Sequence, residues 1–187
     1  MSKASDLNES ILIARLQEPS TRRKAFEEVI AQYSEQLYWQ IRRMVQSHDD
    51  ADDLLQNTFM KAWTSLEQFR GDAKLSTWLH KIAINESLTH IDQMKRKGTA
   101  SLDNDEEANF RLQLIEADTH IDGDELALRL RKAVAMLPEK QQLVFNMRYY
   151  DDMPYEQISN ILGTSIGALK ASYHLAQKKI QQYFADD

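Results

Sequence analysis

Apolar residues recur at helical spacing along almost the whole of this 187-residue sequence, and no alternating run is long enough to predict a strand. Its 5 glycines and 3 prolines are too few for the turns of an all-β chain. The sequence therefore predicts an all-α fold. Helices are expected over 10–16, 20–45, 49–63, 76–96, 124–136, 138–149, 155–162 and 166–182, with caps at Ser20 or Thr21, Asp49 or Asp50, Ser76 and Asp124.

The C-terminal part carries the pattern of a helix-turn-helix. Pro154 is expected at the first position of a short helix that ends at Leu162, where its missing N–H costs little. Gly163 follows, in the place where a left-handed residue commonly ends a helix. Thr164 or Ser165 can then cap a longer helix. The expected inward stripe of that helix consists of Ile166, Leu169, Tyr173, Ala176 and Ile180.

The opposite face of this last helix combines small residues with hydrogen-bond donors. Helical winding places Gly167, Ala171, His174 and Lys178 there, with Lys170 beside them. Small residues let the backbone approach a DNA groove, and lysine or histidine can reach phosphates or base edges. No acidic residue occurs from 164 to 185. The pattern therefore favours a DNA recognition helix over the alternative, an ordinary surface helix with a solvated basic face.

The net charge of -6 is concentrated in one segment. Between residues 99 and 125 nine acids accompany a single base, so this segment carries -8 and the rest of the chain +2. DNA binding depends on the local field and not on the net charge. The acidic segment has weak periodicity and is expected to be a linker that is helical in part around 110–115. Two small helical domains, 1–98 and 125–187, are expected on either side of a linker over 99–124.

Several classes of protein are excluded by what the sequence lacks. It has no cysteine, so disulfides, thiolate zinc sites and cysteine nucleophiles are ruled out. It shows no Gly-rich phosphate loop and no nucleophile motif, so neither an enzyme nor a cofactor is expected. It shows no signal-peptide core and no apolar run near the ~18 residues of a membrane span, which predicts a cytoplasmic protein without membrane insertion. No metal-ligand spacing occurs among His48, His80, His90, His120 and His174.

Residues 69–79 differ in character from the C-terminal helices. A Gly-containing turn there presents aromatic, basic and hydroxyl groups just before a helix, and the stretch 70–98 has six bases against three acids. Aromatic residues among basic ones suit unstacked nucleobases, because stacking contributes ~1–3 kcal/mol per base. The alternative, and the more common use of aromatic residues, is that Phe69 and Trp78 belong to the core. The acidic patch over 49–53 is typical of a helix start, and a basic protein partner is its alternative interpretation.

Three segments, in this order, resemble the bacterial extracytoplasmic-function sigma factors, which are group four of the sigma-seventy family. Residues 50–63, DADDLLQNTFMKAW, are similar to the segment with which that family docks on the clamp helices of RNA polymerase. FRG at 69–71 with WLHKIAIN at 78–85 resembles its promoter-melting segment. LPEKQQ at 137–142, YEQI at 155–158 and GALK at 167–170 resemble its C-terminal helix-turn-helix domain. The resemblance spans nearly the whole chain.

The resemblance implies that the protein binds core RNA polymerase and directs promoter-specific transcription initiation. A loop over 69–75 would capture a flipped base of the minus-ten element, and the second domain would read the minus-thirty-five element. The implied polymerase-binding residues are Asp50, Asp52, Asp53, Leu54, Gln56, Asn57 and Phe59. The implied minus-ten contacts are Phe69, Arg70, Gly71, Lys74, Ser76, Thr77, Trp78, Lys81, Asn85, Lys95, Arg96 and Lys97. The implied minus-thirty-five contacts are Ser165, Gly167, Ala168, Lys170, Ala171, His174 and Lys178.

Two other functions stay open at the level of the sequence. The helix-turn-helix alone also fits a stand-alone transcription regulator that binds duplex DNA as a dimer, although such a regulator does not need polymerase-docking and strand-melting segments. An anti-sigma or adaptor protein would leave the segment 69–85 without a role. Members of the resembled family are often held by an anti-sigma factor, and no residue of this sequence identifies such a partner.

Overall fold

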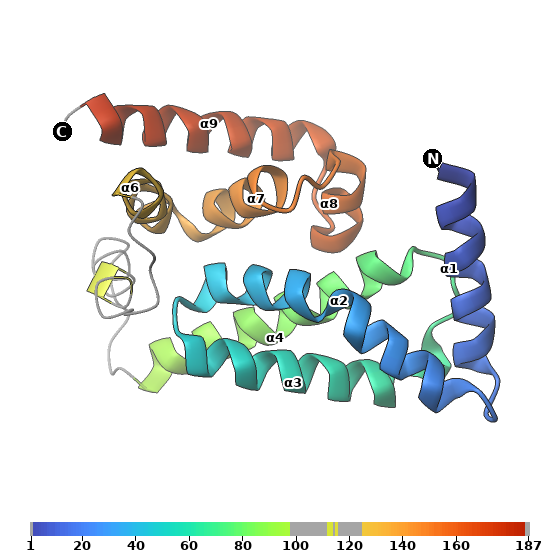
Figure 1. The fold of residues 1–187 in the computed structure, drawn as a ribbon. Helices are drawn as coiled ribbons and strands as arrows, with labels where there is room; N and C mark the ends of the chain where they lie inside the picture. The colour runs from blue at the N-terminus through green and yellow to red at the C-terminus, as the bar shows by residue number, and fades with distance from the viewer. Residues whose placement is uncertain (1, 98–111, 114, 116–124, 186–187) are drawn as a thin grey trace.

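The computed structural model of the protein describes residues 2–97, 112–113, 115 and 125–185. Its helices form two layers (Figure 1), which confirms the all-α expectation. The N-terminal layer consists of α1 Ser2–Gln17, α2 Arg22–Val45, α3 His48–Thr64, the short 3-10 helix η1 Leu66–Gln68 and α4 Leu75–Lys97. The C-terminal layer consists of α6 Glu125–Ala135, α7 Glu139–Tyr149, α8 Tyr155–Leu162 and α9 Ile166–Ala185.

The N-terminal layer is a three-helix unit with α1 laid across one end (Figure 1). The apolar positions of α2 and α4 meet in its interior, where Leu37, Ile41 and Leu79 are fully buried. Full burial of such a side chain contributes roughly 1.5–3 kcal/mol. The helices of this unit are therefore held in fixed rotations, which decides which faces of α3 and α4 remain at the surface.

In the C-terminal layer α9 lies along α6, α7 and α8 (Figure 1). Leu169, Ala176 and Ile180 of its expected inward stripe are buried, and Ile166 and Tyr173 are half-buried, so the stripe is confirmed. Phe145 of α7 stacks on Tyr173, with 5.7 Å between the ring centroids. This packing leaves the opposite face of α9 at the surface.

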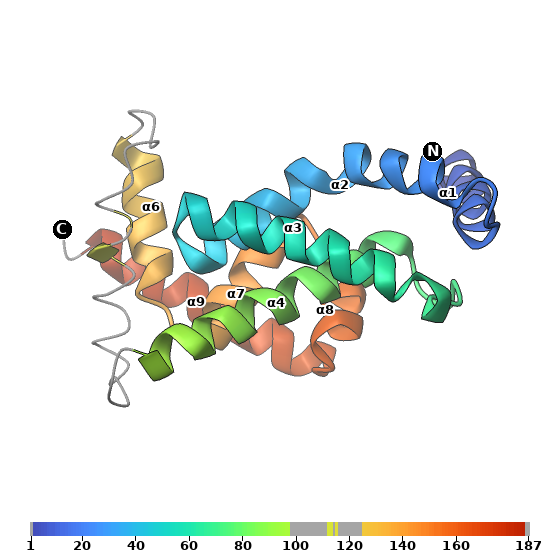
Figure 2. The same ribbon diagram turned by 90° about the horizontal axis from the view of Figure 1, so that it is seen from below.

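The larger of the two buried apolar clusters among the described residues spans both layers. Met147 and Met153 from the C-terminal layer belong to the same buried cluster as Leu37 and Ile41 of α2. α8 packs on α4, and α7 packs on α2. Figure 2, seen from below, shows α7, α8 and α9 behind α2, α3 and α4. The two parts of the chain that resemble promoter-binding segments, 69–85 and the helix-turn-helix, therefore lie within one packed body in this structure.

Several helix starts differ from the expected ones. α3 begins at His48 because Ser47, and not an aspartate, caps it: the Ser47 Oγ accepts a hydrogen bond from the Asp50 N–H at 3.3 Å. Thr21 precedes α2, but its hydroxyl donates to the Arg15 carbonyl of α1 at 2.8 Å and does not cap the helix. α4 begins at Leu75, so Ser76 lies inside the helix and is not its cap.

The turn of the helix-turn-helix has the expected geometry at its glycine. Gly163 ends α8 in the left-handed conformation, with φ of 65°. Of the two expected caps of α9, Ser165 is the one used, since its Oγ accepts a hydrogen bond from the Ala168 N–H at 3.3 Å. Pro154 is the residue before α8 and not its first helical residue, because its ψ of 150° is extended.

Within the acidic segment, Leu112, Gln113 and Ile115 are helical, in line with the expected partial helix, and Ile115 is fully buried. The other residues of 98–124, including the expected cap Asp124, lie outside the described residues. In the part of the chain that the structure describes, every helix is too short or too polar to cross a membrane.

Candidate nucleic-acid and polymerase interfaces

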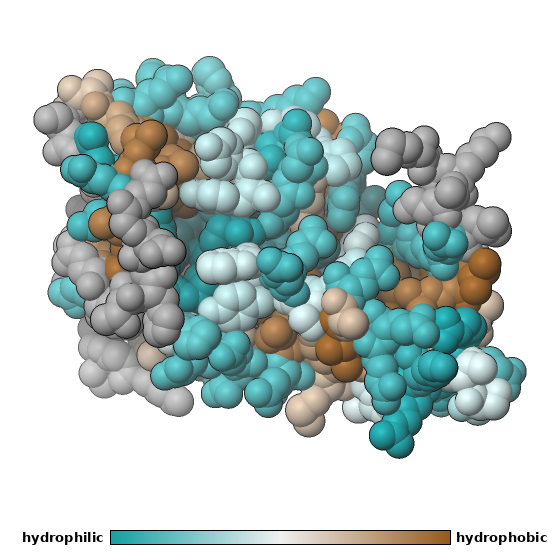
Figure 3. Space-filling view, viewed as in Figure 1, coloured by the Kyte–Doolittle hydropathy of each residue, from teal (hydrophilic) through white to brown (hydrophobic). Residues whose placement is uncertain are grey.

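The outward face of α9 presents all of its candidate DNA-contacting residues to solvent. Apart from the neighbouring residues and the backbone of α9 itself, no described atom lies within 4 Å of the place where a Cβ of Gly167 would stand, so the packing leaves this position open to a close approach from outside. Hydrophilic side chains cover most of the α9 edge in Figure 3. The exposed candidates are Ser165, Gly167, Ala168, Lys170, Ala171, His174 and Lys178.

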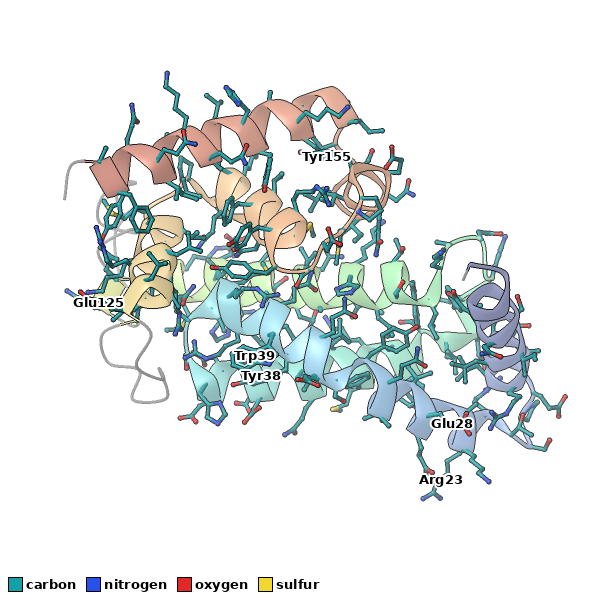
Figure 4. The ribbon with its side chains drawn as sticks, turned by 45° about the horizontal axis from the view of Figure 1, so that its top comes forward. Arg23, Glu28, Tyr38, Trp39, Glu125 and Tyr155 are labelled. Atoms are coloured by element: carbon teal, nitrogen blue, oxygen red, sulfur yellow. The ribbon has the colours of Figure 1, made fainter. Side chains whose placement is uncertain are left out.

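An aromatic residue from α8 supports this face. Tyr155 lies below the first turns of α9 (Figure 4), and the Lys170 Nζ is 5.8 Å from the centroid of its ring. Arg148 of α7 lies over the same ring at 5.5 Å. Cations within about 6 Å of an aromatic face are attracted to it. Tyr155 therefore holds Lys170 near the rim of the recognition face and gathers positive charge there.

The loop before α4 presents only part of its candidate minus-ten residues. Phe69 is 7% exposed, and its ring lies 4.7 Å from that of Trp78, which is half-buried. Thr77 is also 7% exposed, and Ser76 is half-buried. The two aromatic rings thus pack beneath the loop, in agreement with the alternative that Phe69 and Trp78 belong to the core. The exposed candidates are Arg70, Gly71, Lys74, Lys81, Asn85 and Arg96, and the side chains of Lys95 and Lys97 lie outside the described part.

Helix α1 supports the same loop from outside, which the sequence did not indicate. The Glu9 Oε1 accepts a hydrogen bond from the Leu75 N–H at 2.6 Å, so a carboxylate 66 positions away caps α4. A negative charge at a helix N-terminus also interacts favourably with the helix dipole. The loop residue Gly71 has φ of 77°, and a Cβ there would lie 3.7 Å from Ile13 of α1.

The candidate polymerase-binding residues also divide into exposed and buried ones. Asp52, Asp53, Gln56 and Asn57 are exposed on α3, and Asp50 is half-buried near His90, with 3.6 Å between the Asp50 Oδ1 and the His90 Nε2. Leu54 and Phe59 are 5% and 8% exposed and belong to the core. They hold α3 in place and leave its polar face free.

Two apolar residues continue the exposed face of α3 and were missed at the level of the sequence. Met60 is 67% exposed and Trp63 is 42% exposed. They follow Gln56 by four and seven positions, so the three side chains lie along one face. That spacing indicates that they share a face with Gln56, but only the packing shows that they remain exposed. Large exposed apolar side chains beside polar ones are typical of a protein-binding surface.

A buried polar network, which sequence reasoning also missed, joins α2 and α4 to the loop after α7. Arg43 pairs with Asp151, whose side chain is only 2% exposed. The Gln40 Nε2 donates to the Asp151 Oδ2 at 3.4 Å, and the Gln40 Oε1 lies 2.7 Å from the His80 Nδ1. Because the Gln40 oxygen can only accept, the His80 Nδ1 carries the proton in this contact.

Burial shifts both titratable ends of this network. It raises the pKa of Asp151 to about 6, against the opposing effect of the Arg43 charge and the Gln40 hydrogen bond. It lowers the pKa of His80 to about 4, and the Arg43 charge acts in the same direction. His80 is therefore neutral at pH 7, and Asp151 is mostly ionised and paired.

The fold and these surfaces define a helical protein with two separate candidate nucleic-acid interfaces. Comparisons with known proteins identify both regions. Residues 29–97 match the model of Sigma-70 region 2, and residues 127–180 match that of Sigma-70, region 4. The chain is 27% identical over 180 residues to the ECF RNA polymerase sigma-E factor of Salmonella typhimurium, which covers 93% of each chain. It is 28% identical over 177 residues to the RNA polymerase sigma-H factor of Pseudomonas aeruginosa, with 91% of each covered.

Solved structures share the fold. The sigma factor RpoE of Bartonella quintana, in complex with the anti-sigma factor NepR, superposes with a TM-score of 0.67 at 22% identity and covers 88% of this chain and 99% of that one. The chain described here belongs to the extracytoplasmic-function (ECF) group of the sigma-70 family. It is a sigma factor, which binds core RNA polymerase and directs promoter-specific initiation of transcription; a stand-alone regulator is not favoured.

Proposed function

We propose that three exposed faces divide the work of this sigma factor. The outward face of α9 reads the minus-thirty-five element. The loop over 69–75 and the exposed residues of α4 bind the melted minus-ten element, and the exposed face of α3 docks on core polymerase. The domain boundaries that we assign to these roles are 1–98 and 125–187, with 99–124 as the connection.

One observation carries the assignment to α9. Its candidate DNA-contacting residues are all exposed, while the apolar stripe of the same helix is buried or half-buried. A recognition helix needs this division, since one side must seat on the domain while the other enters the major groove. Ser165 at the N-terminal end and Lys178 three turns later mark the length of the face.

For the minus-ten element we propose a division between contact and support. Arg70 and Lys74 contact the single strand, and Lys81 and Asn85 extend that surface along α4. Phe69 and Thr77 are assigned a supporting role because both are buried. Flipping a base from the duplex costs a few kcal/mol, which a loop held in its binding shape can offset.

For polymerase docking we propose Asp52, Asp53, Gln56 and Asn57 as the polar contacts and Met60 with Trp63 as an apolar continuation. The double change Asp53→Arg with Gln56→Ala should weaken binding of core polymerase while the helical circular dichroism stays the same. Glu18→Arg makes the same charge change in the exposed turn after α1 and serves as the matched control. Equal pull-down of core polymerase by the wild type, the double variant and the control would contradict the docking assignment.

The decisive experiment is in vitro transcription with core polymerase, followed by mapping of start sites. We expect defined start sites on a subset of promoters, and permanganate reactivity of thymines in the melted region. The action is one of binding and not of catalysis, and it takes place in the cytoplasm, where the polymerase is. Absence of stimulation on every genomic promoter would overturn the proposal.

An anti-sigma factor is a further proposed partner. The Bartonella quintana relative was solved with such a protein bound, and the fold matches along 88% of the present chain. This proposal is tested by affinity capture from the protein's own cells, with the purified full chain as bait. The captured protein is then added to the in vitro transcription assay. We expect the captured protein to inhibit transcription and an excess of core polymerase to relieve the inhibition.

A further inference from the structure

We propose that Leu175 of α9 reads the C5 methyl group of a thymine in the minus-thirty-five element, so that this sigma factor selects an A·T pair there through an apolar contact. The inference deepens the proposed function of α9 and rests on it. It adds a base-reading residue to a face whose sequence-predicted contacts are all small or polar.

Leu175 is an apolar side chain on the outward side of the recognition helix. Among the described residues of α9 it is the single large apolar residue that is exposed, at 48%. The stripe that seats the helix on its domain runs through Leu169, Ala176 and Ile180, which are buried. Leu175 therefore contributes little to the core, and about half of its surface is available to a binding partner.

The neighbours of Leu175 on the helix surface are small or basic. Leu175 follows Ala168 and Ala171 by seven and four positions and precedes Lys178 by three, so these residues share one side of α9. All three neighbours are exposed. A helical side chain leans toward the N-terminus of its helix, so Leu175 covers the turn at Ala171. The N-terminal part of a recognition helix contacts base edges, and the leucine is directed toward that part.

The position of Leu175 along α9 also suits the groove. It lies eight positions after Gly167, which corresponds to about 12 Å along the helix axis at about 1.5 Å per residue. The major groove of B-form DNA is about 12 Å wide. A helix that enters the groove with Gly167 against the bases therefore keeps Leu175 within the groove.

The charges around Leu175 favour DNA over an apolar protein as the occupant of this face. No acidic residue occurs from 164 to 185, and Lys170, Lys178 and Lys179 are exposed. Tyr155 holds Lys170 at the rim, with 5.8 Å from the Lys170 Nζ to the ring centroid. Burial of these ammonium groups against apolar surface would be costly, whereas DNA phosphates pair with them. A basic rim around an apolar side chain thus matches a groove with phosphates at its edges and a methyl group inside.

The chemistry of the base edges decides which base a leucine selects. In the major groove only thymine presents an apolar group, while adenine, guanine and cytosine present hydrogen-bond donors or acceptors. A leucine placed against those polar groups removes their water and supplies no hydrogen bond, which is unfavourable. Against the thymine methyl group it removes apolar surface from water on both sides. Leu175 therefore selects thymine, in contrast to Lys170 and His174, which carry donors.

Replacement of thymine by uracil tests the contact without any change in the protein, because it removes only the C5 methyl group. Each thymine on both strands of a mapped minus-thirty-five element is replaced in turn, and the affinity of the holoenzyme for each DNA is measured. We expect one position, or two adjacent ones, at which uracil lowers the affinity about fourfold, the effect of one methyl-sized group. Uracil outside the element is the control and should have no effect.

Variants of Leu175 assign the methyl contact to this side chain. Leu175→Ala should bind thymine and uracil DNA equally at the sensitive position, with helical circular dichroism like that of the wild type. Leu126→Ala is the matched control, since it truncates a leucine of α6 that is 64% exposed, and it should keep the wild-type sensitivity. Leu175→Arg should exchange the preference for thymine for one for guanine, because arginine pairs with the O6 and N7 of guanine.

The outcomes separate the methyl contact from the proposed function of α9. A minus-thirty-five element without an A·T pair, or wild-type holoenzyme that binds thymine and uracil DNA equally at every position, would overturn the role of Leu175 and leave the recognition of that element standing. Methyl sensitivity that persists in Leu175→Ala would assign the methyl group to another residue and would also overturn it. If scrambling the whole element leaves holoenzyme binding unchanged, the proposed function of α9 itself fails.

Discussion

The recognition face of α9 and the loop before α4 are built in different ways. On α9 the cap Ser165, the buried Leu169 and the exposed Lys170 all lie within two turns of one helix. The loop over 69–75 depends on residues that are distant in the sequence, above all Glu9 of α1, which caps α4 at Leu75. A surface on one helix is robust because its support is local, whereas a surface on a loop is only as well formed as its distant supports.

Phe69→Ala should produce the largest effect and would sharpen this difference. Phe69 is buried against Trp78, so truncation leaves a cavity and should lower the free energy of unfolding by roughly 3–5 kcal/mol. Urea denaturation followed by circular dichroism measures it. The neighbouring exposed Arg70→Ala is the control and should change stability by no more than about 0.5 kcal/mol. An unchanged urea midpoint for Phe69→Ala would show that this residue does not support the loop.

Lys170→Ala should have the opposite profile, with no measurable loss of stability and a clear loss of promoter binding. A base contact contributes roughly 1–3 kcal/mol to binding. The variant should lose this contribution only on promoters with an intact minus-thirty-five element. Lys179→Ala, another exposed lysine of α9 outside the proposed face, is the control. Binding of the holoenzyme to intact and scrambled elements provides the measurement. An equal loss on both DNAs would identify Lys170 as a phosphate contact.

Glu9→Ala tests whether the loop depends on a residue of another helix. Loss of an N-cap costs about 1 kcal/mol, and we expect a loss of that order in stability together with slower promoter melting. Glu18→Ala removes an exposed acid just beyond α1 and should change neither. Permanganate reactivity over time reports melting. If melting proceeds at the wild-type rate in Glu9→Ala, the loop before α4 is as independent as the face of α9.

The smallest expected effect is on the pH dependence of the free energy of unfolding. It concerns His80 of α4, which has no counterpart on the recognition face of α9. The folded state lowers the pKa of His80 from 6.5 to about 4, so its contribution to stability is present above pH 6.5 and lost as the pH falls toward 4. The raised pKa of Asp151 works in the opposite direction, because the folded state gains stability as the pH falls from about 6 toward 3.8.

The two contributions therefore offset each other in the wild-type protein between about pH 4 and 6. In Asp151→Asn only the His80 contribution remains, so acidification from pH 7 to 5.5 should destabilise this variant more than the wild type, by on the order of 1 kcal/mol. Urea denaturation at the two pH values measures the difference. Parallel changes in both proteins would show that these residues do not titrate as the buried network requires.

Much of the fold could be predicted because its signals are local. The left-handed Gly163 and the buried stripe of α9 follow from neighbouring residues and from helical periodicity. The helix starts were less predictable, because several side chains compete for the same N–H groups. Ser47 caps α3 ahead of Asp49 and Asp50, and Glu9 caps α4 from outside that helix.

The candidate sites were predictable in their location but not in the role of each residue. A motif places Leu54 and Phe59 among polar neighbours, yet both face the core of α2, α3 and α4. Phe69 is likewise buried beneath its loop. Met60 and Trp63 show the reverse, since helical spacing alone does not tell which large apolar residues remain uncovered.

By itself, the sequence determined the helices, the helix-turn-helix and the division of charge, because hydrophobic spacing, glycine conformation and electrostatics act over a few residues. Only the tertiary structure decided that Arg43 meets Asp151, 108 positions away, and that Glu9 reaches α4. The physical reason is that burial and ion pairing depend on which surfaces meet after the helices pack. The recognition face of α9 is determined by the residues of its own helix, whereas the docking of α7 on α2 and of α8 on α4 exists only in the assembled fold.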